Sequence, residues 1–181
     1  MSFVAPRRAL IVAALSLIPA LAFAHGPSRQ KVVEKIEIDA PPAKVWAIVS
    51  NFGDMSWLPG VAKTEATGGN TPDQAKRKLT LGSGGTIDET LTKFDAAGMS
   101  LAYKIDQVDP KVLPVNNYSS TITVTPSADG SKSSVEWKGA FYRGFMNNDP
   151  PPELSDEAAL KAVTDIYKAG LTALKAKAEA K

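Results

Sequence analysis

The chain has 181 residues, no cysteine, one histidine, and 21 basic against 19 acidic residues. Without cysteine, disulfides, thiol catalysis and zinc–thiolate sites are excluded. The single histidine, His25, lies near the N-terminus, so no internal histidine remains to act as the base of a Ser-His or Cys-His pair.

Residues 1–24 have the pattern of a cleavable secretory signal. Arg7 and Arg8 form a positive n-region, 16 uncharged residues follow, and an A-x-A cleavage site ends the stretch at Ala24. A membrane anchor needs about 20 apolar residues, more than this stretch holds. We therefore predict cleavage after Ala24 and a periplasmic protein without a membrane anchor.

The mature chain is expected to hold one domain over 31–181, preceded by a flexible segment over 25–30. Loss of Arg7 and Arg8 with the signal reduces the basic count from 21 to 19, which equals the acidic count. A net side-chain charge near zero does not indicate a nucleic acid or an anionic membrane as a partner. An N-terminal His25 can chelate copper, but no second histidine is present to complete such a site, so neither a metal nor a cofactor is predicted.

A strand predicted over 32–39 leads into the segment 40–61, which is expected to form two short helices. Proline suits a first helical turn, because its missing N–H has no intrahelical partner there. Val45, Trp46 and Val49 follow with the three/four spacing of one helix face. This spacing predicts that Trp46 lies in the core.

The second half of this segment is expected to close one end of the fold. Gly53 is predicted to end the first helix, and a turn then carries Met55, Trp57 and Leu58 into Pro59-Gly60. We expect these three apolar side chains to form a rim where a ligand enters or a partner makes contact.

Six further strand-like runs follow, and each is closed by turn residues such as Gly, Asn, Asp or Pro. Such regular turn signals predict an antiparallel meander instead of βαβ units. The glycine-rich stretch 82–85 lacks the Lys-Ser/Thr of a phosphate loop and lies between strands, so a hairpin turn is predicted there. The runs span 61–67, 75–81, 86–95, 100–108, 117–126 and 133–142.

Alternation along these runs predicts which side chains face inward. Most of them are apolar, but Arg77 and Glu89 fall on the face that is expected to be concave. Gly139 interrupts the apolar face of the last run and is expected to mark a bulge or kink. A sheet with one apolar face needs a cover.

A helix of about twenty residues near the C-terminus is expected to supply this cover. Ser155 is the predicted N-cap, and acidic residues follow in the first turn, where the helix dipole favours them. Apolar residues recur at three/four spacing from Leu160 to Leu174. Gly170 lies mid-helix at a cost of about 1 kcal/mol relative to Ala, which predicts a close approach to the sheet.

Several segments, in this order, resemble the START/Bet v 1-like superfamily, in its SRPBCC or polyketide cyclase/dehydrase branch. The resemblance implies an α+β helix-grip fold: a curved antiparallel sheet around a long C-terminal helix, with two short helices after the first strand. The enclosed space is then either a pocket for an apolar ligand or simply core. The segments are APPAKVWAIVSNFGDMSWLPGV (40–61), GGTIDETLTKFD (84–95), LAYKI (101–105), LPVNNYSSTITVTP (113–126), SSVEWKGAF (133–141) and AGLTALK (169–175).

Within this superfamily, an exported chain with the mature start HGPSRQKVVEKIEI resembles the periplasmic MxaD-type accessory proteins of bacterial methanol oxidation. The resemblance implies a non-catalytic protein that assists electron transfer from a methanol dehydrogenase to a cytochrome c, its expected partners. Two alternatives remain open. One is a periplasmic carrier of a hydrophobic small molecule or lipid, and the other is a cyclase/dehydrase-type enzyme that uses Glu89.

Glu89 is the only candidate catalytic residue, and the resemblance carries no catalytic set over to this chain. Unpaired on an apolar face, its carboxyl would have the raised pKa that a general base requires. The alternative, which we favour, is that Arg77 or a tyrosine hydroxyl satisfies it in a buried polar network. The ligand pocket is predicted to be lined by Trp57, Leu58, Arg77, Leu79, Glu89, Leu91, Tyr103, Tyr118, Trp137, Phe141 and Tyr167.

Overall fold

A computed structural model describes residues 26–180 of the chain. The predicted signal peptide, its cleavage point after Ala24, and His25 lie outside the described residues. Within the described part, no helix is both long enough and apolar enough to cross a membrane.

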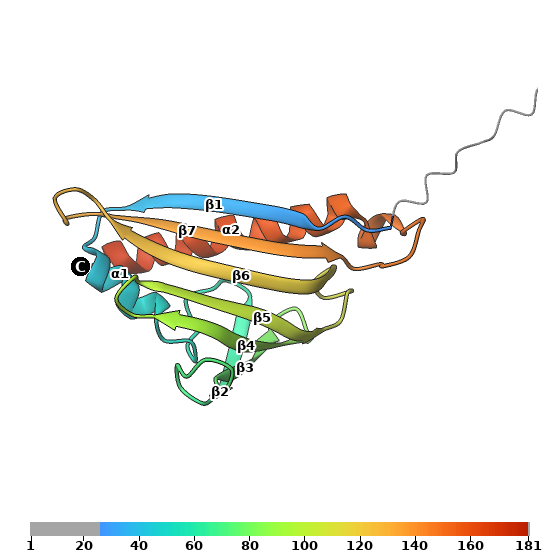
Figure 1. Cartoon of the computed structure of the whole chain (residues 1–181), viewed down its shortest axis with the longest axis horizontal. Helices are drawn as coiled ribbons and strands as arrows, with labels where there is room; N and C mark the ends of the chain where they lie inside the picture. The colour runs from blue at the N-terminus through green and yellow to red at the C-terminus, as the bar shows by residue number, and fades with distance from the viewer. Residues whose placement is uncertain (1–25, 181) are drawn as a thin grey trace, which may run out of the picture.

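In residues 26–180, seven antiparallel strands form one sheet that curves around helix α2 (Figure 1). The strand order is β1-β7-β6-β5-β4-β3-β2, so the strands after α1 form the predicted meander and β1 joins it beside β7. This arrangement confirms the α+β helix-grip fold. The elements are β1 (Gln30–Ile38), α1 (Pro42–Val49), β2 (Val61–Thr67), β3 (Lys76–Leu81), β4 (Thr86–Asp95), β5 (Ser100–Val108), β6 (Val115–Pro126), β7 (Ser133–Arg143), a short 3₁₀ helix η1 (Pro152–Leu154) and α2 (Asp156–Glu179).

Helix α2 covers the concave side of the sheet, as predicted. The Ser155 side chain accepts a hydrogen bond from the Ala158 backbone N–H at 3.2 Å, which confirms the N-cap. A Cβ on Gly170 would lie 2.6 Å from a ring carbon of Trp137 on β7, which confirms the close approach. The buried face of the helix consists of Ala159, Val163, Tyr167, Gly170, Leu171, Leu174 and Ala178.

The segment between β1 and β2 forms one helix, not the two that were predicted. Helix α1 ends at Val49, before the expected end at Gly53, and residues 51–60 fold into turns. Side chains bind the backbone there: the Phe52 N–H donates to Asn70 Oδ1 at 3.1 Å, and the Ser56 N–H donates to Asp54 Oδ1 at 2.8 Å. Such bonds compete with the helical ladder, which explains why no second helix forms.

The prediction for the two tryptophans of this segment was wrong. Trp57 is only 5% exposed, and its ring centroid lies 5.8 Å from that of Trp137. Trp46 is partly buried and packs on Phe94, with ring centroids 5.6 Å apart. Each residue advances around a helix by about 100°, and the buried face of α1 is centred on Val45. Its neighbour Trp46 therefore lies at the edge of that face.

Gly139 marks a close approach instead of the predicted bulge. On both sides of Gly139, β7 pairs in unbroken register, with Val32 on β1 and Ser120 on β6. A Cβ at this position would collide with the Tyr167 hydroxyl of α2. The register shift lies on the neighbouring strand β6, where Asn117 has a φ of 47°.

Candidate ligand pocket

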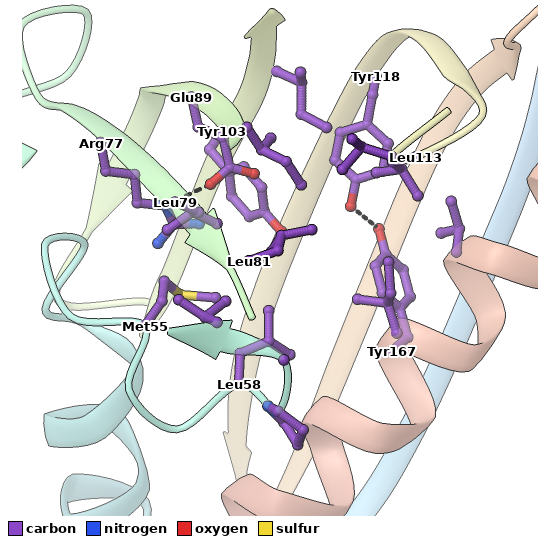
Figure 2. Close-up of a pocket in the computed structure, with 18 of the residues that line it drawn as sticks. Met55, Leu58, Arg77, Leu79, Leu81, Glu89, Tyr103, Leu113, Tyr118 and Tyr167 are labelled. Atoms are coloured by element: carbon purple, nitrogen blue, oxygen red, sulfur yellow. Dashed lines mark hydrogen bonds and ion pairs between the residues drawn. The ribbon is translucent and has the colours of Figure 1, made fainter. Parts of the chain in front are cut away.

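A partly enclosed cavity of about 150 Å³ lies between α2 and the concave face of the sheet. Met55 and Leu58 reach it from the α1–β2 segment, Arg77 and Glu89 from β3 and β4, and Tyr167 from α2 (Figure 2). Most of its wall is apolar. The lining residues are Met55, Leu58, Pro59, Gly60, Val61, Arg77, Leu79, Leu81, Ser83, Ile87, Glu89, Tyr103, Ile105, Val112, Leu113, Tyr118, Trp137, Val163, Ile166 and Tyr167.

Two neighbouring strands separate beside the cavity and leave room for it. Strands β5 and β6 are paired only as far as Lys104 and Ser119, although both strands continue beyond that pair. Ile105 and Tyr118, the first residues past the paired region, both line the cavity. The bulge around Asn117 bends β6 at this point, as such irregularities commonly do.

Eight of the eleven predicted lining residues lie on the cavity wall, namely Leu58, Arg77, Leu79, Glu89, Tyr103, Tyr118, Trp137 and Tyr167. The other three belong to the surrounding core. Trp57 lies against Trp137, and its indole N–H finds no acceptor among the described residues. Leu91 is fully buried, and Phe141 stacks on Tyr118 with ring centroids 6.0 Å apart. Strand alternation assigns Leu91 and Phe141 to the inward face of the sheet but gives no position along the strand, so it could not separate them from the cavity wall.

Sequence reasoning missed two loops that wall the cavity. Val112 and Leu113 reach it from the β5–β6 loop, and Val112 lies so close to Gly85 that a Cβ there would overlap it. The Gly82 N–H donates to the Gly60 carbonyl at 2.9 Å, which ties the β3–β4 hairpin to the α1–β2 segment. The available signal was the adjacent pair of large apolar residues in a loop, since such side chains are usually buried.

Arg77 and Glu89 form an ion pair on the cavity wall. They face each other across β3 and β4, with 2.5 Å between Arg77 Nε and Glu89 Oε2, and both residues are about 5% exposed. Arg77 Nη1 also donates to the Phe52 carbonyl at 3.0 Å. Its guanidinium carbon lies 4.1 Å from the Phe52 ring centroid and 4.9 Å from that of Tyr103, so two aromatic faces hold the cation.

Burial raises the pKa of the Glu89 carboxyl above its ordinary value, and the Arg77 charge opposes this shift. Arg77 thus acts as the partner that was considered as the alternative to a catalytic role for Glu89. A general base must be free to take a proton from a substrate. One carboxylate oxygen is engaged with Arg77, and a catalytic role would have to use the other.

Three tyrosines and a tryptophan of the cavity wall form a hydrogen-bonded group with Ser120, which does not itself line the cavity. Tyr118 Oη lies 2.6 Å from Tyr167 Oη, and Tyr167 Oη lies 2.9 Å from Ser120 Oγ. Trp137 Nε1 donates to Ser120 Oγ at 2.8 Å and to Tyr103 Oη at 3.2 Å. Burial raises the pKa of Tyr103 to about 12 and also raises that of Tyr118 and Tyr167, so all three phenols stay protonated at neutral pH.

The described residues contain no group of three or more histidine, cysteine or acidic side chains that could hold a metal ion. The chemistry that this wall offers is therefore van der Waals contact with apolar surface, together with a few hydrogen bonds. Such a combination is typical of a pocket for a small organic ligand.

A family model described as "Polyketide cyclase / dehydrase and lipid transport" matches residues 29–179. The chain belongs to this family. A comparison with curated proteins found no match.

Several solved structures are similar to this chain. An uncharacterised protein from Bacillus thuringiensis is 31% identical, and the match covers 82% of this chain and 98% of that one with a TM-score of 0.68. The protein XoxI from Bacillus cereus is 32% identical over 81% of this chain and 94% of its own, with the same TM-score of 0.68. Norcoclaurine synthase from Thalictrum flavum, solved with dopamine and hydroxybenzaldehyde, shares the fold at 16% identity, with coverage of 94% and 96% and a TM-score of 0.63.

Proposed function

We propose that this domain binds a small, largely apolar molecule in the cavity between α2 and the sheet, without catalysis of its own. One observation carries the proposal: the cavity wall is apolar, and its two charged groups, Arg77 and Glu89, neutralise each other. A charged ligand would lose its hydration there without gaining a free counter-charge. The family description, which includes lipid transport, supports binding as the function.

The described surface carries no large apolar patch, so a partner protein would dock mainly through polar contacts. Among residues 26–180, the exposed large apolar side chains are Val33 on β1, which is 54% exposed, and Met146 in the β7–α2 loop, which is 41% exposed. Surfaces that bind partner proteins usually present contiguous apolar patches of several hundred Å². Two single side chains on separate segments do not supply such a patch.

Native mass spectrometry of the protein taken from its own cells tests the proposal. We expect a co-purifying small molecule whose occupancy is lost in Ile166→Phe, because the added ring enters the cavity mouth from α2. Ala169→Phe is the matched control, since this exposed position lies three residues further along the same helix. If the protein carries no small molecule and binds none that is added to it, the proposal is wrong.

We further propose that the protein is exported and supports alcohol oxidation in the periplasm. The signal pattern of residues 1–24 and the resemblance to MxaD-type proteins support this role. Its partners would be a methanol dehydrogenase and the cytochrome c that the dehydrogenase reduces. The mature protein should then raise the rate of electron transfer when it is added to the two purified partners. An unchanged rate at stoichiometric excess contradicts the role, and fractionation of cells tests the location separately.

A further inference from the structure

Strand register places lysines, and no acidic residue, in two neighbouring cross-strand rows on the face of the sheet turned away from α2 (Figure 1). All the lysines of these rows are exposed. We call the two rows the lysine rows. They are Lys31–Ala140–Ser119–Lys104–Thr90–Lys76, from β1 to β3, and Val33–Lys138–Thr121–Ala102–Lys93, from β1 to β4.

On either side of the lysine rows, opposite charges lie directly across from each other on paired strands. Lys35 on β1 is opposite Glu136 on β7, with 2.8 Å between the charged groups. Lys78 on β3 is opposite Asp88 on β4, at 3.6 Å. Opposite charges in such positions stabilise a sheet, whereas like charges destabilise it. The lysine rows lack this compensation within themselves, so an anion from outside would supply it.

Two carboxylates from outside the rows reach part of this charge. Glu136, which already pairs with Lys35, lies 3.7 Å from Lys138. Asp106 lies 3.0 Å from Lys104. The other lysines of the rows form no ion pair among residues 26–180, namely Lys31, Lys76 and Lys93.

Small side chains in the middle of the lysine rows leave a shallow hollow of about 400 Å³. Ala102 and Ser119 line it, together with Lys31 and Lys138. Arg29 adds a further cation beside it and donates a hydrogen bond to Ser119 Oγ at 3.2 Å. The hollow therefore combines cations with room for the backbone of another chain.

The dimensions and composition of this surface indicate which kind of anion it fits. The longer row crosses five strand spacings of about 4.8 Å, or about 24 Å, which is the length of about seven residues of extended peptide. Segments that bind membrane surfaces insert several apolar side chains, whereas Val33 is the one exposed large apolar residue in these rows. Sites for single-stranded nucleic acid use aromatic side chains on which bases stack, and neither row contains one.

We propose that the lysine rows bind an extended acidic segment of a partner protein. This surface and the cavity lie on opposite faces of the sheet, so the inference does not rest on the proposed ligand. It adds a protein-binding site to the domain and states the chemistry of the partner.

NMR titration of the isotope-labelled protein with a heptaglutamate peptide tests the proposal. We expect the chemical-shift changes to follow the lysine rows, and the affinity to fall as salt is raised above about 0.1 M, where charges more than about 10 Å apart are screened. Neutralising the unpaired lysines in Lys31→Gln/Lys76→Gln/Lys93→Gln should weaken binding about tenfold, since each exposed ion pair contributes little alone.

A matched control variant removes the same number of exposed lysines from other parts of the chain, where they form no ion pair. It is Lys44→Gln/Lys111→Gln/Lys177→Gln, with changes in α1, the β5–β6 loop and α2, and it should bind the peptide as the wild type does. Circular dichroism shows whether both variants keep the fold.

Three results would each overturn the proposal. One is an equal loss of affinity in the two triple variants, because the peptide would then respond only to net charge. The second is no binding of the peptide at low salt. The third is tighter binding of phosphatidylglycerol vesicles or of an oligothymidylate, which would assign the rows to another class of partner. None of these results bears on the ligand of the cavity, which native mass spectrometry of both variants follows separately.

Discussion

In the Arg77–Glu89 pair, a large cost of desolvation opposes a large electrostatic attraction. Removing two charges from water costs several kcal/mol per ion, and only close contact with further hydrogen bonds repays it. Three interactions offset this cost of desolvation: the 2.5 Å contact of the pair, the hydrogen bond from Arg77 to the Phe52 carbonyl, and the cation–π contacts of Arg77 with two aromatic rings. The pair therefore contributes little net stability while it is intact, but the loss of one partner leaves an uncompensated charge.

Replacement of Arg77 by methionine should lower the free energy of unfolding by about 3–5 kcal/mol at neutral pH. The double variant Arg77→Met/Glu89→Met should recover most of this loss, because apolar side chains of similar volume replace both charges. Urea unfolding followed by circular dichroism measures both values. Lys78→Met is the matched control: its pair with Asp88 is half-exposed at 3.6 Å, so its removal should cost less than about 1 kcal/mol. A single Arg77 variant as stable as this control would contradict the account.

The pH dependence of the Arg77→Met variant follows from the same pair. The pKa of Glu89 is raised in the folded protein, so its contribution to stability is complete below the unfolded pKa of about 4.3 and is lost as pH rises through the folded pKa. Arg77 lowers that pKa, and its removal should make the loss steeper and extend it to higher pH. Unfolding free energies measured at intervals from pH 4 to pH 8 should therefore diverge from those of the wild type as pH rises. If the unfolding free energies of the variant and the wild type ran parallel over this pH range, Glu89 would not be the group responsible for the pH dependence.

At the scale of the elements, small residues set the distance between α2 and the sheet. Gly139 on β7 leaves space for the Tyr167 hydroxyl, and Gly170 on α2 leaves space for Trp137 and Leu58. These two contacts place the Tyr167 ring where it can stack on Trp137 and reach Ser120. The hydrogen-bonded group of the cavity wall thus depends on glycine, which has no side chain, at positions 139 and 170.

Gly170→Ala should destabilise the protein by up to about 2 kcal/mol in spite of the better helix propensity of alanine. The new Cβ would meet Trp137 at 2.6 Å and Leu58 at 2.8 Å, and overpacking of this kind costs typically 1–3 kcal/mol against a propensity gain of about 1 kcal/mol. Thermal unfolding measures the difference, and tryptophan fluorescence reports the displaced Trp137. The exposed Ala169→Gly variant isolates the propensity term. A more stable Gly170→Ala variant would mean that α2 is free to move away from β7.

The elements themselves were predictable because the sequence carries strong local signals for them. Alternation, regular turn residues and the Ser155 cap predict strands and a helix that the structure confirms to within a few residues. The prediction of a second short helix was wrong because backbone N–H groups of that segment donate to the side chains of Asn70 and Asp54, and Asn70 lies far along the chain. A local pattern cannot reveal a partner of that kind.

At the scale of the whole molecule, the cavity depends on features that no single segment encodes. Alternation predicted the inward face of each strand, and eight predicted side chains reach the cavity. The separation of β5 from β6, and the contact of Val112 with Gly85, arise only when distant loops meet. The hydrogen-bonded group around Ser120 likewise requires three strands and a helix in register.

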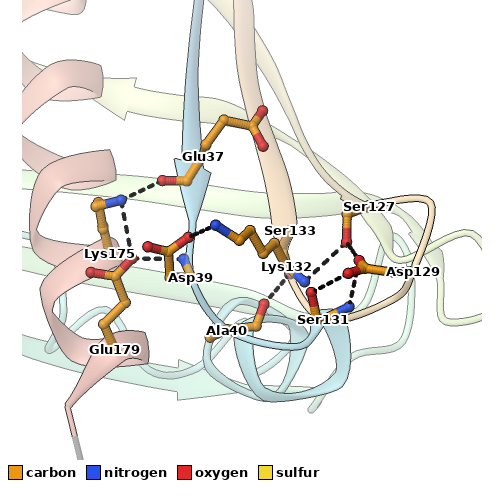
Figure 3. Close-up of polar contacts among 10 residues, drawn as sticks. All are labelled: Glu37, Asp39, Ala40, Ser127, Asp129, Ser131, Lys132, Ser133, Lys175 and Glu179. Carbon is orange, nitrogen blue, oxygen red and sulfur yellow. Dashed lines mark hydrogen bonds and ion pairs between the residues drawn. The ribbon is translucent and has the colours of Figure 1, made fainter.

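The C-terminal end of β1, the last turn of α2 and the β6–β7 hairpin meet, and polar and charged groups hold them together (Figure 3). Glu179 Oε1, in the last turn of α2, accepts a hydrogen bond from the Asp39 N–H at 2.7 Å and lies 3.0 Å from Lys175 Nζ. Lys175 also donates to the Glu37 carbonyl at 2.6 Å, and Lys132 of the β6–β7 hairpin pairs with Asp39 at 2.8 Å. The end of β1 is thereby fastened to both α2 and the hairpin.

Glu179→Ala should loosen the contact between the end of β1 and the last turn of α2 without unfolding the protein. The bond from the Asp39 N–H, and then the charge of Lys175, hold the pKa of Glu179 below its ordinary value. In the wild type this contribution is therefore present above the unfolded pKa and is lost as pH falls through the folded pKa. Hydrogen exchange followed by NMR should show the Asp39 amide protected at neutral pH in the wild type and exposed in the variant. Asp165→Ala, which removes an exposed pair with Lys161 elsewhere on α2, is the control and should leave the Asp39 amide protected. Equal protection in Glu179→Ala would mean that backbone packing alone holds β1 against the end of α2.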